Sequence, residues 1–386
     1  MSDVFTLTED QRVLRKEWRR LFEDKFTERA AEIDQTGEFP WDNLKVLADS
    51  GLAGINVPEE YGGGGADSVT HCVLVEEVAR VCASTSLIPA VNKLATLPVL
   101  FAGTDEQKRR FLPPIAEGER IASYCLTEPG SGSDAAAMRS RAVRDGDDYV
   151  LNGTKRFITG GGASKTYVYY AVTDPAAGSR GISAFVLEDS MPGFEIGKHE
   201  DKLGIRGSPT TEVICNDVRV PAANRLGEEG DGFPLALRAL DHSRITIGAQ
   251  AVGIAQGALD YALGYVEERE QFGRRIAEFQ GLQFMFADMA MQTEAARTLV
   301  YQAAAKADRG DPDLTFFGAA AKCFASDVAM KVTTDAVQLL GGYGYIKDYP
   351  LERMMRDAKI TQLYEGTNQI LRVVMARQLR RQRGQA

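Results

Sequence analysis

The chain has 386 residues and a mass of 42.1 kDa, which is long enough for two or three domains, each with its own buried core. Its 44% hydrophobic and 26% charged residues are typical of a soluble globular protein. The net charge of −9 and the pI near 5.2 argue against a general nucleic-acid-binding protein, which would need a basic face.

The first residues lack the apolar core of a secretory signal and the acid-poor, Arg- and Ser-rich character of a transit peptide. No uninterrupted apolar run approaches membrane-spanning length. The five cysteines are scattered and form no CxxC, which favours buried reduced thiols over disulfides. The three histidines are too dispersed for a metal site or a Ser–His triad. We therefore expect a cytoplasmic, bacterial protein without a metal, nucleic acid or membrane as partner.

Residues 1–120 are predicted to form a helical domain. Four segments, beginning at Thr8, Pro40, Ser68 and Thr104, each open with a helix start signal. Thr8 is followed three residues later by Gln11, which is the spacing of a capping box. The glycine run 62–65 is expected to be a flexible loop between two of these helices.

Residues 121–228 have a different texture. The runs TYVYYAVT, GISAFVLE and TEVICNDVRV are short, rich in β-branched and aromatic residues, and separated by turn-forming segments. This spacing predicts a small β-barrel or sandwich. Residues 229–386 return to apolar positions every three or four residues, which predicts long helices in an up-down four-helix bundle. The expected fold is a multidomain α+β protein with an all-α domain, a small β domain and a helical bundle.

The segment YCLTEPGSGSDAAAM lies where the helices give way to strands. Gly130 and Gly132 permit close backbone approach, and the neighbouring hydroxyls and N–H groups suit an anion, an amide or a ring edge. No Gly-Lys-Ser/Thr follows, and the segment is not a Rossmann fingerprint between a strand and a helix. A tight turn rich in glycine and serine is the structural alternative.

The next segment, LNGTKRFITGGGAS, contains an Asn-Gly pair that predicts a hairpin turn. Phe157, Ile158 and Thr159 then fall on the following strand, where an aromatic ring and a hydroxyl could face a planar cofactor. A core phenylalanine and a capping threonine are the alternative roles.

Three weaker signals lie in the C-terminal part. Asp241 and Arg244 are one helical turn apart, as in a surface ion pair or a ligand contact. Arg269 is a candidate phosphate partner. The glycines at 341 and 342 permit close backbone approach at a helix end.

Glu365, in the segment TQLYEGTNQI, is unusual for a helix surface. No basic residue lies between Lys359 and Arg372, so no helical neighbour can pair with this carboxylate. Gly366 follows it directly and weakens the helix. The sequence thus places an unpaired acid at a break in the backbone.

The segments YCLTEPGSGSDA, KRFITGG, REQFG, QLLGGYGY and MRDAKITQLYEGTNQI, in this order, resemble the acyl-CoA dehydrogenases. The resemblance runs essentially end to end and is closest to the short-chain, butyryl-type members. It implies an FAD-dependent enzyme that converts a short- to medium-chain acyl-CoA to the trans-2-enoyl-CoA. Glu365 would remove the α-proton from the thioester, flavin N5 would accept hydride, and electrons would pass to an electron-transfer flavoprotein. A carboxylate in a dry pocket has a raised pKa, which suits a carbon acid.

The resemblance also implies the binding residues. The oxyanion would meet the Glu365 N–H and a flavin ribityl hydroxyl. Substrate contacts are expected at Ser133, Asp241, Arg244 and Gly366. At Gly366, a side chain would crowd the thioester. FAD contacts are expected at Tyr124, Cys125, Leu126, Thr127, Gly132, Ser133, Phe157, Ile158, Thr159, Arg269, Gln271, Phe272, Gln280, Gln338, Leu339, Leu340, Gly341, Gly342, Thr367, Asn368 and Gln369.

Two positions depart from the family pattern or vary within it. The family usually has Trp where this chain has Phe157, on the side from which the electron-transfer partner approaches. Some relatives carry the base on the long helix, at the position of Ser243 in this chain. Because Ser243 is not an acid, Glu365 is the sole candidate.

The segments at Arg269 and at 338–342 resemble those that hold the FAD of a neighbouring subunit, which implies a homotetramer built as a dimer of dimers. Straight short to medium acyl chains are the first expectation and 2-methyl-branched ones the second, in fatty-acid β-oxidation or branched-chain amino-acid catabolism. An oxidase or monooxygenase on the same fold, and a catalytically silent binding protein, remain alternatives.

Overall fold

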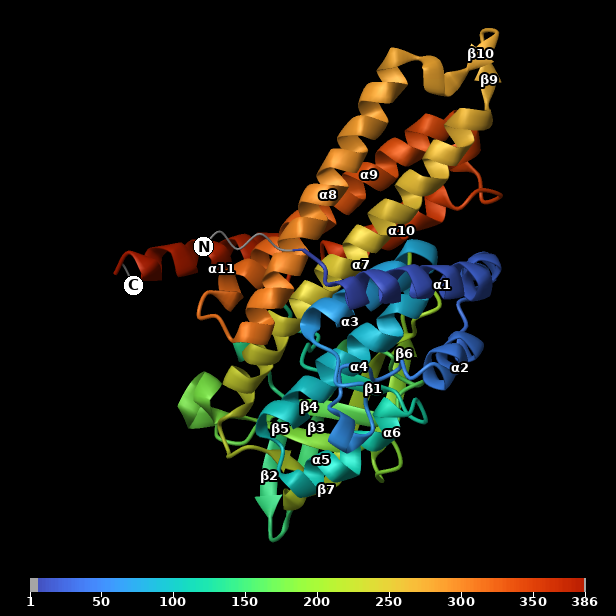
Figure 1. Ribbon diagram of the computed structural model, residues 1–386. Coiled ribbons are helices and arrows are strands. Elements are labelled where there is room, and N and C mark those ends of the chain that lie inside the picture. Colours follow the sequence, from blue (N-terminus) through green and yellow to red (C-terminus); the bar gives the residue numbers. More distant parts are fainter. Residues whose placement is uncertain (1–5, 385–386) are drawn as a thin grey trace.

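A computed structural model describes residues 6–384. An N-terminal group of helices, a central sheet and a C-terminal group of long helices follow one another along the chain (Figure 1). This order confirms the expected fold class. The N-terminal elements are α1 (Glu9–Thr36), α2 (Trp41–Asp49), the 3-10 helix η1 (Glu59–Tyr61), α3 (Ser68–Val81), α4 (Ala83–Ala102), α5 (Asp105–Phe111) and α6 (Pro113–Ala116).

The predicted capping box at the start of α1 is confirmed. The Gln11 N–H donates to Thr8 Oγ1 over 3.2 Å, and the Thr8 N–H donates to Gln11 Oε1 over 3.0 Å. Helix α4 is the one long N-terminal helix that the start signals do not predict. It carries Pro89 and Pro98 in its interior, and burial in the core stabilises it despite them.

In the described part of the chain, α4 alone is long and apolar enough to cross a membrane. However, 78% of its most apolar window is buried inside the molecule. This burial is the pattern of a core helix, and length and composition are weak signals by themselves.

The central part forms one eight-stranded sheet in the order β6-β7-β3-β2-β4-β5-β8, with β1 added parallel to β4. The three predicted runs form β4, β5 and β7. The strands are β1 (Ala122–Cys125), β2 (Arg141–Asp145), β3 (Asp148–Thr159), β4 (Thr166–Val172), β5 (Ile182–Glu188), β6 (Phe194–His199), β7 (Thr210–Pro221) and β8 (Arg225–Leu226), with short 3-10 turns η2 (Ala135–Ala137), η3 (Pro175–Gly181) and η4 (Ala222–Asn224).

The hairpin turn predicted at Asn152–Gly153 was wrong. This pair lies inside β3, where the register against β7 shifts between Leu151 and Gly153 and the glycine has φ of 150°. Asn152 there faces two residues of β7, Asn216 and Asp217, so the pair lies opposite a β-bulge in the middle of two long strands. The turn itself lies between β2 and β3, where Gly146 has φ of 63°.

The C-terminal part packs α7 against α8 and α9, and α7 continues beyond the rest of the molecule as a projection with α8 (Figure 1). A two-stranded hairpin caps its tip. The elements are α7 (Gly232–Glu268), β9 (Glu270–Gln271), β10 (Arg274–Arg275), η5 (Ile276–Glu278), α8 (Gln280–Arg309), α9 (Leu314–Leu340), η6 (Gly341–Tyr345), α10 (Leu351–Thr361) and α11 (Asn368–Gln382).

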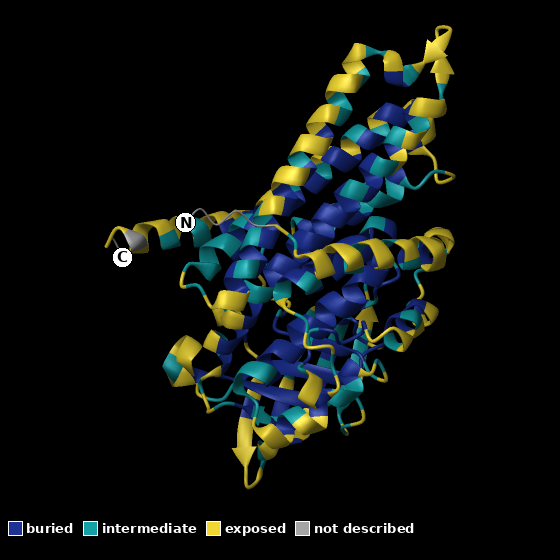
Figure 2. Ribbon diagram, in the orientation of Figure 1, coloured by how far each residue is buried: buried dark blue, intermediate teal, exposed yellow. Residues whose placement is uncertain are grey.

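The interior is continuous between the helical parts, whereas the tip of the projection is exposed (Figure 2). Apolar residues of α3, α4, α7, α8 and α9 form one large cluster, so the N-terminal helices and the bundle share a core. All five cysteines are free and buried, as expected.

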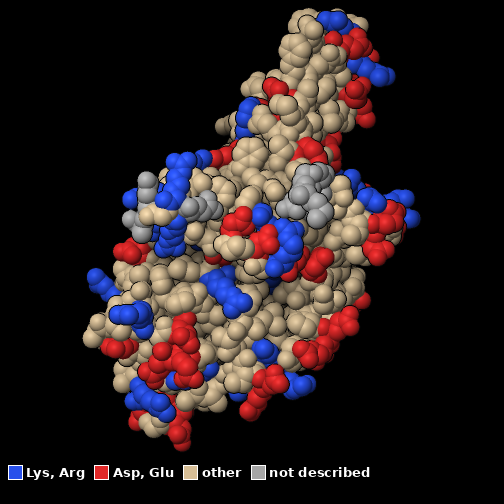
Figure 3. Space-filling model, turned by 60° about the vertical axis from the view of Figure 1, so that its left-hand side comes forward, with Lys and Arg blue, Asp and Glu red and all other residues tan. Residues whose placement is uncertain are grey.

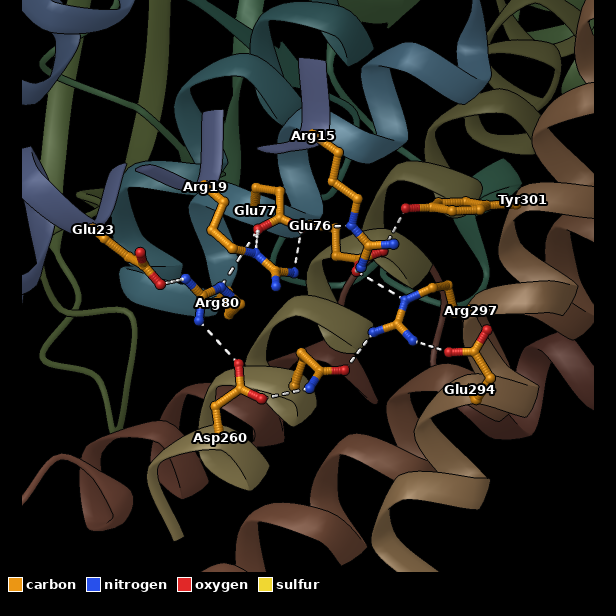
Figure 4. A network of polar contacts seen from close by, with 11 residues as sticks. Arg15, Arg19, Glu23, Glu76, Glu77, Arg80, Asp260, Glu294, Arg297 and Tyr301 are labelled. Carbon is orange, nitrogen blue, oxygen red and sulfur yellow. Dashed lines mark hydrogen bonds and ion pairs between the residues drawn. The ribbon is translucent and has the colours of Figure 1, made fainter. Parts of the chain in front are cut away.

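An ion-pair network also joins α1 to α3, α7 and α8 (Figure 4). Glu77, with no exposed surface, receives hydrogen bonds from Arg15 and Arg19 of α1 at 2.8 to 2.9 Å. Glu76, equally buried, receives one from Arg297 of α8 at 2.9 Å and one from the Tyr301 hydroxyl at 2.7 Å. The network fixes the first helix on the rest of the molecule.

Candidate active site

Glu365 lies in the turn between α10 and α11, and two helices hold it in place. The Ser243 hydroxyl of α7 donates to Glu365 Oε2 over 2.5 Å, and Arg244 Nε donates to the Glu365 main-chain oxygen over 3.2 Å. Glu365 has φ of 52°, in the left-handed region that non-glycine residues rarely adopt. Strained backbone of this kind persists where surrounding contacts determine it, and such residues cluster at functional sites.

The carboxyl group of Glu365 is electrostatically unusual. Burial raises its pKa to about 7, against the lowering effects of the Ser243 hydrogen bond and the nearby charges of Arg244 and Lys322. Within residues 6–384, no Lys or Arg forms an ion pair with this carboxylate. The raised pKa agrees with the expectation from the sequence, and it gives Glu365 the properties of a base that works near neutral pH.

The backbone conformation and the packing at position 366 both favour glycine. Its φ is 97°, and a Cβ at this position would lie 3.2 Å from Leu371 Cδ2. The expected crowding of a thioester is therefore not needed to explain this glycine.

The loop after β1 is held from beneath by a buried ion pair that the sequence did not suggest. Lys155 Nζ donates to the Leu126 main-chain oxygen over 3.1 Å and to Glu128 Oε1 over 2.8 Å. Glu128 also accepts the main-chain N–H groups of Arg139 and Ser140. Lys155 lies in a strand and has no exposed surface. Its place in a strand is visible in the sequence but its burial is not, so the sequence could not predict this support.

The glycines of this loop lie at the surface. A Cβ placed on Gly130 or Gly132 would meet no atom of the chain within 4 Å, so the fold itself leaves open space there. Thr127 is half-buried, and Ser133 is exposed. Cys125 has no exposed surface and its side chain belongs to the core of the sheet, so its expected cofactor contact stays a prediction for its main-chain atoms.

The second expected wall of the cofactor site lies at the end of β3. The register shifts between Lys155 and Ile158, and Phe157 in this bulge has φ of 57° and is 58% exposed. The bulge therefore turns the aromatic ring outward. The Ile158 side chain is 2% exposed and packs in the core, so its expected cofactor contact stays a prediction for its main-chain atoms. Thr159 is half-buried at the strand end.

A third region lies at the far end of the projection. A pocket of about 420 Å³ brings together most of the residues expected to hold the distal part of FAD. Phe272 and Gln280 are exposed near this pocket but do not line it. The expected residues that do line it are Arg269, Gln271, Gln338, Leu339, Leu340, Gly341 and Gly342.

The structure does not bring this pocket to Glu365 of the same chain. Arg244 lies within α7 and Arg269 caps its end, which places them about 38 Å apart at a rise of 1.5 Å per residue. Within one chain, the expected binding residues therefore form two separate groups.

The residues after Glu365 have different roles. The Thr367 hydroxyl caps α11 by accepting the Ile370 N–H over 3.3 Å, and Gln369 is exposed. Asn368 is 2% exposed, and its amide donates to Ser326 Oγ over 2.8 Å and to Asp327 Oδ1 over 2.8 Å. Its side-chain amide is thus bonded to α9, and the contact of Asn368 with the cofactor stays a prediction for its remaining atoms.

The chain combines N-terminal helices, a central sheet and C-terminal helices with a glycine-containing loop, a glycine-lined pocket and a turn that carries Glu365. This combination is that of a cofactor-dependent enzyme. The family models for the acyl-CoA dehydrogenase N-terminal, middle and C-terminal domains match residues 8–119, 123–218 and 230–380. The chain therefore belongs to the acyl-CoA dehydrogenase family. Members of this family depend on FAD, so the protein is a flavin-dependent oxidoreductase.

Individual relatives are similar over nearly their whole length. The chain is 58% identical to the probable acyl-CoA dehydrogenase fadE25 of Mycobacterium leprae, over 99% of this chain and 98% of the relative. The butyryl-CoA dehydrogenase structure from Megasphaera elsdenii superimposes with a TM-score of 0.94 at 45% identity, over 97% and 99% of the two chains. A chain solved in work on the electron transferring flavoprotein of Acidaminococcus fermentans superimposes with a TM-score of 0.95 at 50% identity, over 97% of this chain and 99% of that chain.

Proposed function

We propose that the protein oxidises a short- to medium-chain acyl-CoA to the trans-2-enoyl-CoA, with Glu365 as the base that removes the α-proton. The observation that carries this proposal is a carboxyl group with a pKa raised to about 7, free of ion pairs and held in a strained turn by Ser243 and Arg244. Bound FAD would supply the hydride acceptor, flavin N5.

The residues around Glu365 support this role in two ways. The Ser243 hydrogen bond orients the carboxylate, because it fixes one of its two oxygens. Arg244 holds the main-chain oxygen of Glu365, so the peptide plane between Glu365 and Gly366 is constrained. We propose that the Glu365 N–H then meets the thioester oxygen as it gains negative charge during proton removal.

The remaining predicted contacts form part of the same proposal. The flavin would contact Tyr124, Cys125, Leu126, Thr127, Gly132, Ser133, Phe157, Ile158, Thr159, Thr367, Asn368 and Gln369. The substrate would contact Ser133, Asp241, Arg244 and Gly366. The Tyr124 hydroxyl donates to the Ala236 oxygen of α7 over 3.2 Å, which ties the flavin loop to the helix that holds the base. Domain limits at 1–120, 121–228 and 229–386 are proposed on the same basis.

A cofactor shared between subunits accounts for the separation of the two groups of binding residues. The pocket at the tip of the projection lies too far along α7 to serve Glu365 of its own chain, so we propose that it receives FAD from a neighbouring subunit in a dimer of dimers. The projection shows mostly uncharged surface (Figure 3), and Phe284 and Met291 of α8 are 61% and 65% exposed. Such a surface suits burial between subunits.

The relatives support the choice of substrate and electron acceptor. Similarity to a butyryl-CoA dehydrogenase favours straight short chains, with 2-methyl-branched thioesters second. Similarity to a chain studied with an electron transferring flavoprotein supports such a protein as the acceptor. We propose that the enzyme acts in the cytoplasm, in fatty-acid β-oxidation or branched-chain amino-acid catabolism.

The pH dependence of flavin reduction should follow the ionisation of Glu365. Only the carboxylate can accept the α-proton, and its pKa of about 7 means that the active fraction increases as pH rises through neutrality. We expect the rate constant, measured by stopped-flow absorbance with saturating acyl-CoA, to rise about tenfold per pH unit below pH 6 and to level off above pH 8. A flat profile from pH 5 to 9 would exclude a group with this pKa as the base.

The dehydrogenase activity is tested by its products. With butyryl-CoA and a one-electron ferricenium acceptor, the holoenzyme should form one trans-2-enoyl-CoA per two acceptors reduced. In air without the acceptor, hydrogen peroxide should form far more slowly than this turnover. Peroxide release equal to enoyl-CoA formation would instead identify an oxidase, and no product with any acyl-CoA would identify a silent family member.

A further inference from the structure

Lys322 of α9 is buried directly behind the turn that carries Glu365. It lies in the alanine-rich stretch GAAAKCFAS and has no exposed surface. Its Nζ donates to the Gly366 main-chain oxygen over 2.8 Å and to Asn368 Oδ1 over 3.0 Å. Both acceptors are uncharged oxygens within three residues of Glu365.

The turn needs such support because two successive residues have positive φ. A left-handed conformation is strained at a non-glycine residue such as Glu365, so external contacts must hold it. Arg244 of α7 binds the Glu365 oxygen on one side, and Lys322 of α9 binds the Gly366 oxygen on the other. The two successive carbonyl groups are thus fixed by cations from two different helices.

The charge of Lys322 is also unusual. Within the described part of the chain it forms no ion pair with an acid, although a fully buried lysine is nearly always paired. Burial lowers its pKa to about 7, and Glu365 is the strongest of the charges that oppose this effect. In turn, the charge of Lys322 lowers the pKa of Glu365. Each group therefore favours the ionised form of the other without direct contact.

We propose that Lys322 is a positioning residue for the base: it fixes the turn through the Gly366 oxygen and, in its protonated form, favours the ionised form of Glu365. This proposal rests on the proposed role of Glu365 as the base. Two helices then support the carboxylate in different ways. Helix α7 donates a hydrogen bond to it from Ser243, whereas Lys322 of α9 acts through the Gly366 main chain and through its charge.

The test compares Lys322→Met and Lys322→Gln with a matched control, Lys331→Met. Lys331 lies on the same helix, is exposed, and pairs with Asp335 on the surface. All variants are purified as holoenzyme, FAD content is read from the visible absorbance, and flavin reduction by butyryl-CoA is followed from pH 5.5 to 9.

We expect both Lys322 variants to retain FAD and to bind butyryl-CoA with little change. Their pH profile should shift upward by roughly one unit, because the cation that lowers the pKa of Glu365 is gone. Above the shifted midpoint, Lys322→Met should remain roughly tenfold slow, whereas Lys322→Gln, which can still donate to the Gly366 oxygen, should lose less. The control should match the wild type throughout.

Two results would overturn the proposal. Wild-type rates and an unchanged midpoint in both Lys322 variants would show that neither the bond nor the charge matters. Loss of FAD in both variants, with retention in Lys331→Met, would assign Lys322 to the fold alone. A parallel Glu365→Gln variant separates these results from a failure of the base assignment, because only that failure leaves Glu365→Gln active.

Discussion

Replacement of Glu365 by glutamine is expected to slow flavin reduction by acyl-CoA by about 10²–10⁴-fold. The amide keeps the shape of the side chain and can still accept the Ser243 hydroxyl through its oxygen, but it cannot take a proton from carbon. The protein should remain folded, because the substitution removes a buried charge rather than adding one. Stopped-flow absorbance of the flavin after anaerobic mixing with butyryl-CoA measures the rate constant.

Two controls give this result its meaning. FAD content and the spectral shift of the flavin on acyl-CoA binding should match the wild type, which shows that only the chemical step is affected. Glu106→Gln, at an exposed position on α5, should reduce its flavin at the wild-type rate. A Glu365→Gln rate within tenfold of the wild type would refute the assignment of Glu365 as the base.

Replacement of Glu77 by glutamine is expected to lower the free energy of unfolding by about 3–5 kcal/mol. Glu77 has no exposed surface and accepts hydrogen bonds from Arg15 and Arg19, and it pairs with Arg80 at 3.4 Å (Figure 4). Glutamine leaves these arginines without the charge that compensates them in the interior. The midpoint of urea denaturation of the holoenzyme, combined with its slope, measures the change.

The matched control is Glu9→Gln, whose carboxylate forms a surface pair with Arg12 and should contribute less than about 1 kcal/mol. The pH dependence has a definite sign. Burial raises the pKa of Glu77, but the hydrogen bonds and charges of Arg19 and Arg15 outweigh it, so the net pKa is below the ordinary 4.5. Its contribution is therefore complete above pH 5 and is lost as pH falls through the folded-state pKa. A loss as small as that of Glu9→Gln would show that the network does not stabilise the fold.

Much of the fold could be predicted because its signals are local. Helix starts with capping residues and apolar positions at helical spacing identified α1, α7 and α9, and β-branched runs identified β4 and β5. The failures have equally physical causes. Pro89 and Pro98 disfavour a helix locally, yet burial of α4 on both sides overrides them. Asn152–Gly153 has the composition of a hairpin turn, but pairing with β7 on either side keeps it inside a strand, opposite a bulge of β7.

Some features of the site could likewise be predicted from local sequence, and others depend on the fold. Glu365 could be predicted because its lack of nearby bases and its following glycine are visible in the sequence. Ser243, Lys322 and Lys155 could not be assigned their contacts, since each bonds a segment distant in sequence or depends on burial. The sequence also did not predict that the Asn368 amide bonds α9, and the cofactor contact that its motif implies stays a prediction.

The central claim is that this chain is an FAD-dependent dehydrogenase for short to medium acyl-CoA thioesters. Anaerobic titration of the flavin absorbance with a graded series of straight and 2-methyl-branched acyl-CoAs tests it most directly. We expect a straight chain of about four to eight carbons to bleach the flavin most completely, with 2-methyl-branched and longer chains less effective. Absence of bleaching with every acyl-CoA, in protein that retains its FAD, would contradict the account.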